Sequence, residues 1–196
     1  MIIVNNPEKA QNAIILGNGL TEYKIIEALV DKFEINGVKV FIIHGAYRRK
    51  NLIVKSTIGG VNAIKTLQML IKLTKRGIFN FKKIGIIIDN EHVDELRKTL
   101  KTILNLDLKA RKYAEFVIDN FMVFISICGK KKCIEENISD LIMELFPNAL
   151  VPPTKREIRN FLRTKKLKLK KIINLADRQV LIAHLGCIVK ILKRLS

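Results

Sequence analysis

The sequence lacks tryptophan and has few aromatic residues of any kind, which make up 6% of its 196 residues. Aliphatic side chains must therefore fill most of its core. It also lacks any apolar run approaching the roughly 18–20 residues that a membrane-spanning helix needs, which predicts a protein without a membrane span. Its first residues lack the basic region and the apolar segment of a signal peptide, so we expect a cytoplasmic protein.

Cysteine is also scarce. The three cysteines, Cys128, Cys133 and Cys187, cannot all pair with one another, and they lack the C-x-x-C spacing typical of zinc sites. We therefore expect three buried, reduced thiols. The abundance of Ile and Lys with little Gln is compatible with a thermophilic source, although a biased genome composition produces the same pattern.

Acidic residues are the minority among the charged ones. The chain has 36 Lys and Arg against 18 Asp and Glu, a formal net charge of +18, and residues 152–196 alone carry 13 basic and 2 acidic side chains. Such an excess favours a polyanionic partner, with nucleic acid first and an anionic membrane surface second. The alternative is a solvated surface in a Lys-rich protein.

Four short apolar runs, each followed later by a helical pattern, organise most of the chain. Runs rich in β-branched residues are typical of strands buried on both faces, and strand–helix alternation favours parallel pairing with right-handed crossovers. We predict an α/β fold: a Rossmann-like, parallel four-stranded sheet with helices on both faces. The predicted strands are residues 12–16, 38–43, 84–88 and 121–127, and the predicted helices lie near residues 21–33, 61–71, 93–103 and 138–145.

Prolines mark the best candidate for a domain boundary. Three of them between residues 147 and 153 interrupt the last helical pattern. We predict an α/β domain over residues 1–150. A basic helical extension over residues 151–196 is expected to pack on or beside it. Residues 44–58 are predicted to be a polar, basic connection.

The strongest local feature is a group of carboxylates after the third apolar run. Asp89, Glu91, Asp94 and Glu95 follow directly on Ile84–Ile88. In open parallel α/β sheets, ligands bind at the carboxyl ends of the strands, so this group is a candidate site. The alternative is that Asp89 caps the following helix and that the other acids favour its dipole.

Two segments together resemble the Toprim domain of topoisomerases, bacterial-type primases, OLD-family nucleases and recombination mediators. Asn18-Gly19 follows the first predicted strand, with Glu22 four residues after Asn18, and Asp89-Asn-Glu91 follows the third. In the family these strands end in Glu-Gly and Asp-x-Asp. Parallel strands bring both ends to one edge, so we expect Asn18 and Asp89 to be neighbours.

The closest likeness is to small stand-alone Toprim-like proteins of unassigned function. Gly59-Gly60 before the second helix and Ile134-Glu135 before the fourth are similar to features of that group, and Arg97 lies in the third helix. The resemblance covers roughly residues 10–147. The resemblance implies an α/β domain that binds Mg²⁺ and acts on phosphoryl groups.

The resemblance implies a metal site with altered residues. Mg²⁺ prefers oxygen ligands, so Asp89 and Glu91 are the expected metal ligands, and the ion would polarise a phosphoryl oxygen. Asn18 replaces the general acid or base of the family, and its amide cannot exchange a proton near neutral pH. Glu22 is the candidate substitute. We therefore assign Asn18, Glu22, Asp89 and Glu91 to a degenerate catalytic site.

Three functions remain open at this point. The first is a Toprim-like nucleic-acid-binding protein with a degenerate divalent-metal site, acting as a subunit or regulator in repair, replication or defence. The second is a Mg²⁺-dependent nuclease or phosphoryl-transfer enzyme using Asp89 and Glu91. The third is a non-catalytic α/β interaction protein with a solvated basic tail.

The expected partner is nucleic acid, contacted through its backbone with little sequence preference, and a homodimer or larger complex is compatible with the sequence. The few aromatics near the basic segments argue against base stacking. For the basic segment over residues 163–171, the alternative is a basic amphipathic helix that lies on a membrane or on an acidic partner. The expected phosphate contacts are Arg48, Arg49, Lys50, Arg163, Lys165, Lys166, Lys168, Lys170 and Lys171.

Overall fold

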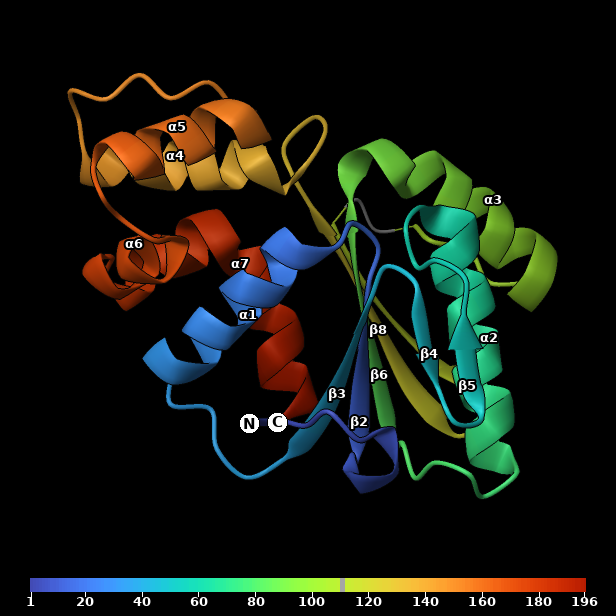
Figure 1. The fold of residues 1–196 in the computed structure, drawn as a ribbon. Helices are drawn as coiled ribbons and strands as arrows, with labels where there is room; N and C mark the ends of the chain where they lie inside the picture. The colour runs from blue at the N-terminus through green and yellow to red at the C-terminus, as the bar shows by residue number, and fades with distance from the viewer. Residues whose placement is uncertain (110–111) are drawn as a thin grey trace.

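The computed structural model describes residues 1–109 and 112–196 of the chain. At its centre is a six-stranded sheet in the order β1-β3-β2-β6-β8-β7 (Figure 1). Strand β7 is antiparallel to β8, and the other neighbours are parallel. The strands are β1 (Ile2–Ile3), β2 (Asn12–Leu16), β3 (Lys39–His44), β6 (Lys83–Asp89), β7 (Tyr113–Ile118) and β8 (Phe121–Cys128).

The four predicted strands form the interior of this sheet. Strands β2, β3, β6 and β8 match the apolar runs to within one residue at each end. The α/β class with a mostly parallel sheet is confirmed. The predicted count of four strands is wrong, because β1 and β7 extend the sheet at its two edges.

Helices cover both faces of the sheet (Figure 1). Along β2, Ile14 and Leu16 point to one apolar core whereas Ala13 and Ile15 point to the other, as the alternation of a strand requires. The face of Ala13 packs against α2 (Gly60–Lys75), α3 (Val93–Leu104) and a hairpin of β4 (Tyr47–Arg49) and β5 (Leu52–Val54). The face of Ile14 packs against α1 (Leu20–Lys32), α4 (Ile134–Leu145), α5 (Lys155–Thr164), α6 (Leu169–Leu175) and α7 (Arg178–Leu195).

The polar connection predicted over residues 44–58 contains the β4–β5 hairpin. Its Leu52 and Val54 are buried in the apolar core on the face of Ala13, together with α2 and α3. The basic segment over residues 151–196 comprises α5, α6 and α7. No helix in the described parts of the chain has the length and apolar character to cross a membrane.

Helix α7 packs directly on the centre of the sheet. A Cβ at Gly85 of β6 would lie 2.8 Å from the Ile191 side chain, so the missing side chain allows the helix to approach β6 closely. The Asn12 amide donates a hydrogen bond to the Leu195 carbonyl at 2.6 Å and thereby binds the end of α7 to β2. The C-terminal helix is therefore part of the hydrophobic core.

A disulfide joins Cys128, at the end of β8, to Cys187 in α7 across 59 residues of sequence. The prediction of three reduced thiols is wrong for this pair, and Cys133 is the free cysteine. Sequence spacing did not indicate the pairing, because the two residues meet only when α7 lies across β8. The bond fastens the C-terminal helix to the sheet.

Helices α2 and α3 meet at a glycine. A Cβ at Gly60 would overlap the backbone nitrogen of Leu96, so a larger residue there would push the two helices apart. The Glu95 carboxylate accepts a hydrogen bond from the Gly60 N–H at 2.6 Å, at the first turn of α2. Glu95 therefore stabilises the start of α2 and takes no part in the acidic group described next.

Candidate metal centre at the carboxyl edge of the sheet

Strands β2 and β6 bring the two predicted motifs together. Leu16 pairs with Ile87 in the parallel register, and the Gly17 N–H donates a hydrogen bond to the Ile87 carbonyl at 2.7 Å. Two residues beyond this pair, the backbone reaches Asn18 after β2 and Asp89 at the end of β6. The expected proximity of these two residues follows from this register.

Asp89 is buried, with 4% of its surface exposed. Its Oδ1 accepts a hydrogen bond from the Ile134 N–H at 2.8 Å, at the first residue of α4. The carboxylate therefore lies at the positive end of the dipole of α4, and not of the helix that follows Asp89 in the sequence. The alternative in which Asp89 caps the helix directly after it does not occur, because its side chain makes no such hydrogen bond.

Two further buried carboxylates lie beside Asp89. Glu22, in the first turn of α1, is 1% exposed, and Glu135, in the first turn of α4, is 4% exposed. We call Glu22, Asp89 and Glu135 the acidic cluster. Three carboxylates out of water cannot all remain charged without a compensating cation or proton.

The pKa values show this penalty. Burial and then the neighbouring charge of Glu22 raise the pKa of Asp89 to about 8, against the lowering effect of the hydrogen bond from Ile134. Burial also raises the pKa of Glu22 above its ordinary value, and the charge of Glu135 adds to the rise, whereas the charge of Lys155 offsets part of it. Without a bound cation, Asp89 therefore holds a proton at neutral pH.

The hydrogen bonding of the cluster is incomplete. Five buried atoms at the cluster have no hydrogen-bond partner among the described residues: both carboxylate oxygens of Glu22, both polar side-chain atoms of Asn18, and Oε1 of Glu135. Among the described residues, Lys155 is the one cation within ion-pairing distance of the acidic cluster, and its Nζ lies 3.6 Å from Oε1 of Glu135. Buried polar atoms left without partners are typical of a position where a ligand or ion supplies the missing contacts.

Two carboxylates of the acidic cluster, together with Cys133, lie close enough to hold one ion. One ligand atom from each of Asp89, Cys133 and Glu135 lies within 4.8 Å of the others. Burial and the neighbouring Glu135 raise the pKa of Cys133 to about 12, so at neutral pH it is a thiol and a weak ligand. The carboxylate oxygens therefore favour a hard cation over a soft one.

Glu91, predicted as the second metal ligand, lies outside this group. It belongs to the short helix η2 (Asn90–His92), its side chain is 49% exposed, and its Oε1 lies 3.8 Å from Nε2 of His92. Glu91 influences Asp89 only as a minor charge. Its backbone N–H donates to the Lys132 carbonyl at 2.9 Å, which ties η2 to the loop before α4.

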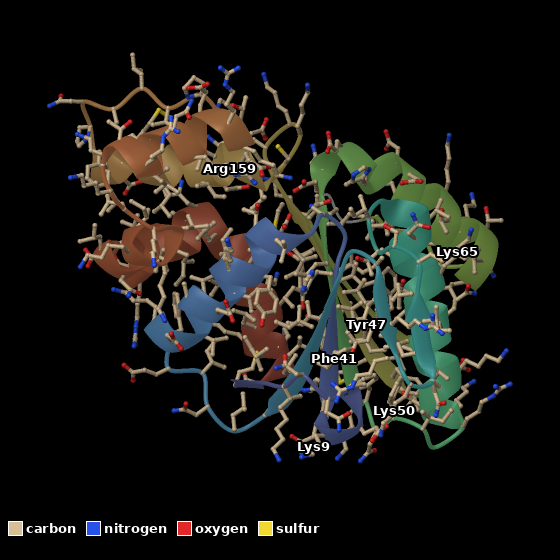
Figure 2. The ribbon with its side chains drawn as sticks, viewed as in Figure 1. Lys9, Phe41, Tyr47, Lys50, Lys65 and Arg159 are labelled. Atoms are coloured by element: carbon tan, nitrogen blue, oxygen red, sulfur yellow. A yellow bond between two sulfur atoms is a disulfide. The ribbon has the colours of Figure 1, made fainter. Side chains whose placement is uncertain are left out.

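The basic residues predicted to contact phosphates occupy two separate regions. Arg48, Arg49 and Lys50 belong to the β4–β5 hairpin, where Lys50 lies 3.5 Å from Glu8. Figure 2 shows Lys50 near the end of the molecule opposite Arg159 of α5. The remaining ones lie at the end of α5, in the turn after it and in α6: Arg163, Lys165, Lys166, Lys168, Lys170 and Lys171.

The second basic segment is not one continuous helix. Lys166 adopts a left-handed backbone conformation with φ of 51°, which separates α5 from α6. Within α6, Lys170 pairs with Asp31 of α1 at 2.6 Å. The single basic amphipathic helix considered as an alternative is therefore absent from residues 163–171.

The sequence did not assign Glu135 or Cys133 to the site. The Ile134-Glu135 pair was noted as part of the family resemblance, and this was the signal that could have identified Glu135. Nothing in its spacing from Asp89 revealed that α4 begins against the end of β6. That contact depends on the packing of β8 beside β6.

Comparison of the chain with protein-family models, with curated proteins and with solved structures finds no match. The fold and the site define an α/β protein with a buried acidic cluster at the carboxyl edge of a mostly parallel sheet. Its function is therefore inferred from this geometry.

Proposed function

We propose that the protein is a Toprim-like nucleic-acid-binding protein that holds a divalent cation, Mg²⁺ in the first place, at the acidic cluster. The observation that supports this most is the pair of buried Glu22 oxygens without hydrogen-bond partners, beside two more buried carboxylates. One lysine cannot neutralise three carboxylates. A divalent cation would both neutralise them and complete their coordination.

The proposed ligands come from different elements. Asp89 follows β6, Glu135 begins α4, and Glu22 lies in α1, so an ion would tie these elements together. Asn18 can contribute its carbonyl oxygen, whose present lack of partners fits that role. Such an ion, when bound, supplies a positive charge that attracts and polarises a phosphoryl oxygen.

The loop before α4 offers phosphate contacts beside the cluster. The Oε2 of Glu136 accepts hydrogen bonds from the backbone N–H groups of Lys130, Lys131 and Lys132, at 2.6, 2.7 and 3.1 Å, which fixes the loop. The side chains of Lys131 and Lys132 are exposed, and no ion pair holds them within the described residues. We infer that they contact a phosphate held near Asp89.

Helix α5 extends this basic surface. A shallow groove of about 430 Å³ is lined by Lys155, Arg156, Arg159, Asn160 and Arg163. Lys155 also reaches Glu135, so the groove lies next to the cluster. A row of cations that continues to a metal site suits a sugar–phosphate backbone.

Nucleic-acid binding is expected to weaken steeply as salt is added. With the double variant Lys131→Glu and Lys132→Glu, we expect at least a tenfold loss of affinity for a short oligonucleotide, and the slope of log affinity against log salt should fall by about 2. Fluorescence anisotropy with labelled DNA and RNA at several salt concentrations measures both quantities.

The matched control is Lys9→Glu, at the opposite end of the molecule from Arg159 (Figure 2). It removes the same type of charge and is expected to change affinity less than twofold. The control changes the net charge by half as much as the double variant, so a control loss of half the size, on a logarithmic scale, would show that only net charge matters. No binding at low salt would favour the non-catalytic interaction protein instead.

A Mg²⁺-dependent nuclease or phosphoryl-transfer enzyme is the second candidate. The raised pKa of Glu22, caused first by burial, is the observation that favours it, because a shift in this direction suits a carboxyl group that acts as a general acid or base. We expect Asp89→Ala to abolish any Mn²⁺-supported cleavage and Glu91→Ala to retain most of it. Cleavage that survives Asp89→Ala would contradict the assignment.

A further inference from the structure

A cavity of about 880 Å³ lies on the face of the sheet that carries α1, α4, α5 and α6. Its volume falls in the range of small-molecule sites in proteins. The apolar part of its lining is aliphatic and includes Ile3, Leu20, Ile158, Leu162 and Leu169. Leu20 is 60% exposed, so its side chain is open to a ligand in the cavity.

The cavity is elongated along α1. Both Leu20, at the start of the helix, and Asp31, near its end, contribute to the lining. Eleven residues of α-helix correspond to about 16 Å. A ligand that fills the cavity can therefore be long and narrow.

The charged groups around the cavity are unequally satisfied. Two of its acids are paired, Asp31 with Lys170 at 2.6 Å and Glu135 with Lys155 at 3.6 Å. Glu27 is the third acid of the lining. Three further cations of the lining form no ion pair within the described residues: Lys24, Arg159 and Lys168. The cavity therefore has a surplus of positive charge over an aliphatic interior.

We propose that this cavity binds an amphipathic anion, an aliphatic chain that ends in a phosphate or carboxylate group. The chain would lie against Leu20, Leu162 and Leu169, where it removes apolar surface from water. The head group would meet the cations that have no partner, chiefly Arg159, whose planar guanidinium suits both kinds of anion. The lining contains no aromatic side chain on which a nucleobase could stack.

This proposal does not depend on the metal centre. Titration calorimetry on the full chain, with EDTA present, tests it with three probes below their aggregation concentrations: decyl phosphate, decanoate and decanol. We expect at least one of the two anions to bind at one site per chain, at least tenfold more tightly than decanol, and to raise the unfolding temperature. The stronger of the two identifies the head group. Equal binding of decanol would overturn the assignment of an anionic head.

Variants separate the two parts of the site. We expect Arg159→Glu and Leu20→Gln each to weaken binding of the preferred anion at least fivefold. Leu20 is largely exposed, so this change leaves the core intact. Two matched controls lie outside the cavity: Lys65→Glu, on the far side of the molecule from Arg159 (Figure 2), and Ile53→Gln, an exposed residue of β5. Both should retain binding within twofold.

Failure of both decyl anions to bind would overturn the proposal, as would losses of the same size in the control variants. Adenosine monophosphate that binds as tightly as the decyl anions, and competes with them, would show a nucleotide site instead. Because EDTA removes divalent cations, failure of the metal centre cannot produce any of these outcomes.

Discussion

The Asp89→Asn variant should be more stable than the natural protein at pH 8 in the absence of metal. We expect its free energy of unfolding to be higher by on the order of 3 kcal/mol at pH 8 and nearly unchanged at pH 4. Asn keeps an acceptor oxygen for the Ile134 N–H, which Asp89 now binds at 2.8 Å. Urea denaturation at a series of pH values, with EDTA present, measures the difference.

The sign follows from the pKa of Asp89. Burial and the charge of Glu22 raise it to about 8, whereas an Asp in an unfolded chain has a pKa of about 4. Between these pH values the folded protein holds a proton that the unfolded chain has released. The stability that this group contributes is therefore complete below pH 4 and is lost as the pH rises to about 8. The amide has no charge to bury and escapes the loss.

Glu91→Gln is the matched control for this experiment. Its side chain is 49% exposed, so removing its charge should change stability by less than about 0.5 kcal/mol at either pH. A loss of stability in Asp89→Asn at pH 8 would contradict the structure of the cluster. It would mean that the Asp89 carboxylate is well compensated by groups of the protein itself.

The second large effect concerns the disulfide. Removing the bond between Cys128 and Cys187, by reduction or by changing both residues to Ala, should lower the free energy of unfolding by about 4 kcal/mol, because the bond closes a loop of 59 residues. Loosening should begin in α7, which the bond fastens to β8. Thermal unfolding with and without reductant measures the loss, and hydrogen exchange locates it.

Cys133→Ala provides the control, because Cys133 takes no part in the bond. This variant should respond to reductant as the natural protein does, whereas the double variant should not respond at all. If reductant leaves the natural protein unchanged, Cys128 and Cys187 are thiols in solution. The prediction of reduced cysteines made from the sequence would then stand.

Much of the fold could be predicted because the central strands are apolar on both faces. Ile84–Ile88 has no polar residue, so burial on two sides was the natural interpretation, and the structure confirms it. The edge strand β7 was missed because it has no continuous buried run: its exposed residues, which include Glu115, alternate with partly buried ones. Its pairing with β8 is a tertiary contact that no local pattern reveals.

Part of the candidate site could also be predicted, because it lies at the ends of the apolar central strands. Asn18 and Asp89 follow parallel strands, and strand–helix alternation predicts that such strands end at the same edge of the sheet. Glu135 enters the site from the start of α4, through the hydrogen bond between Asp89 and Ile134. A hydrogen bond between residues 45 positions apart leaves no periodic signal in the sequence.

The metal centre itself can be tested most directly by anomalous diffraction from crystals soaked in Mn²⁺. We expect one ion about 2.0–2.5 Å from carboxylate oxygens of both Asp89 and Glu135, with Glu22 or Asn18 completing the protein ligands. Crystals of Asp89→Asn treated in the same way should lack it. An ion bound only at Glu91 on the surface, or no ion at saturating Mn²⁺, would contradict the proposed centre.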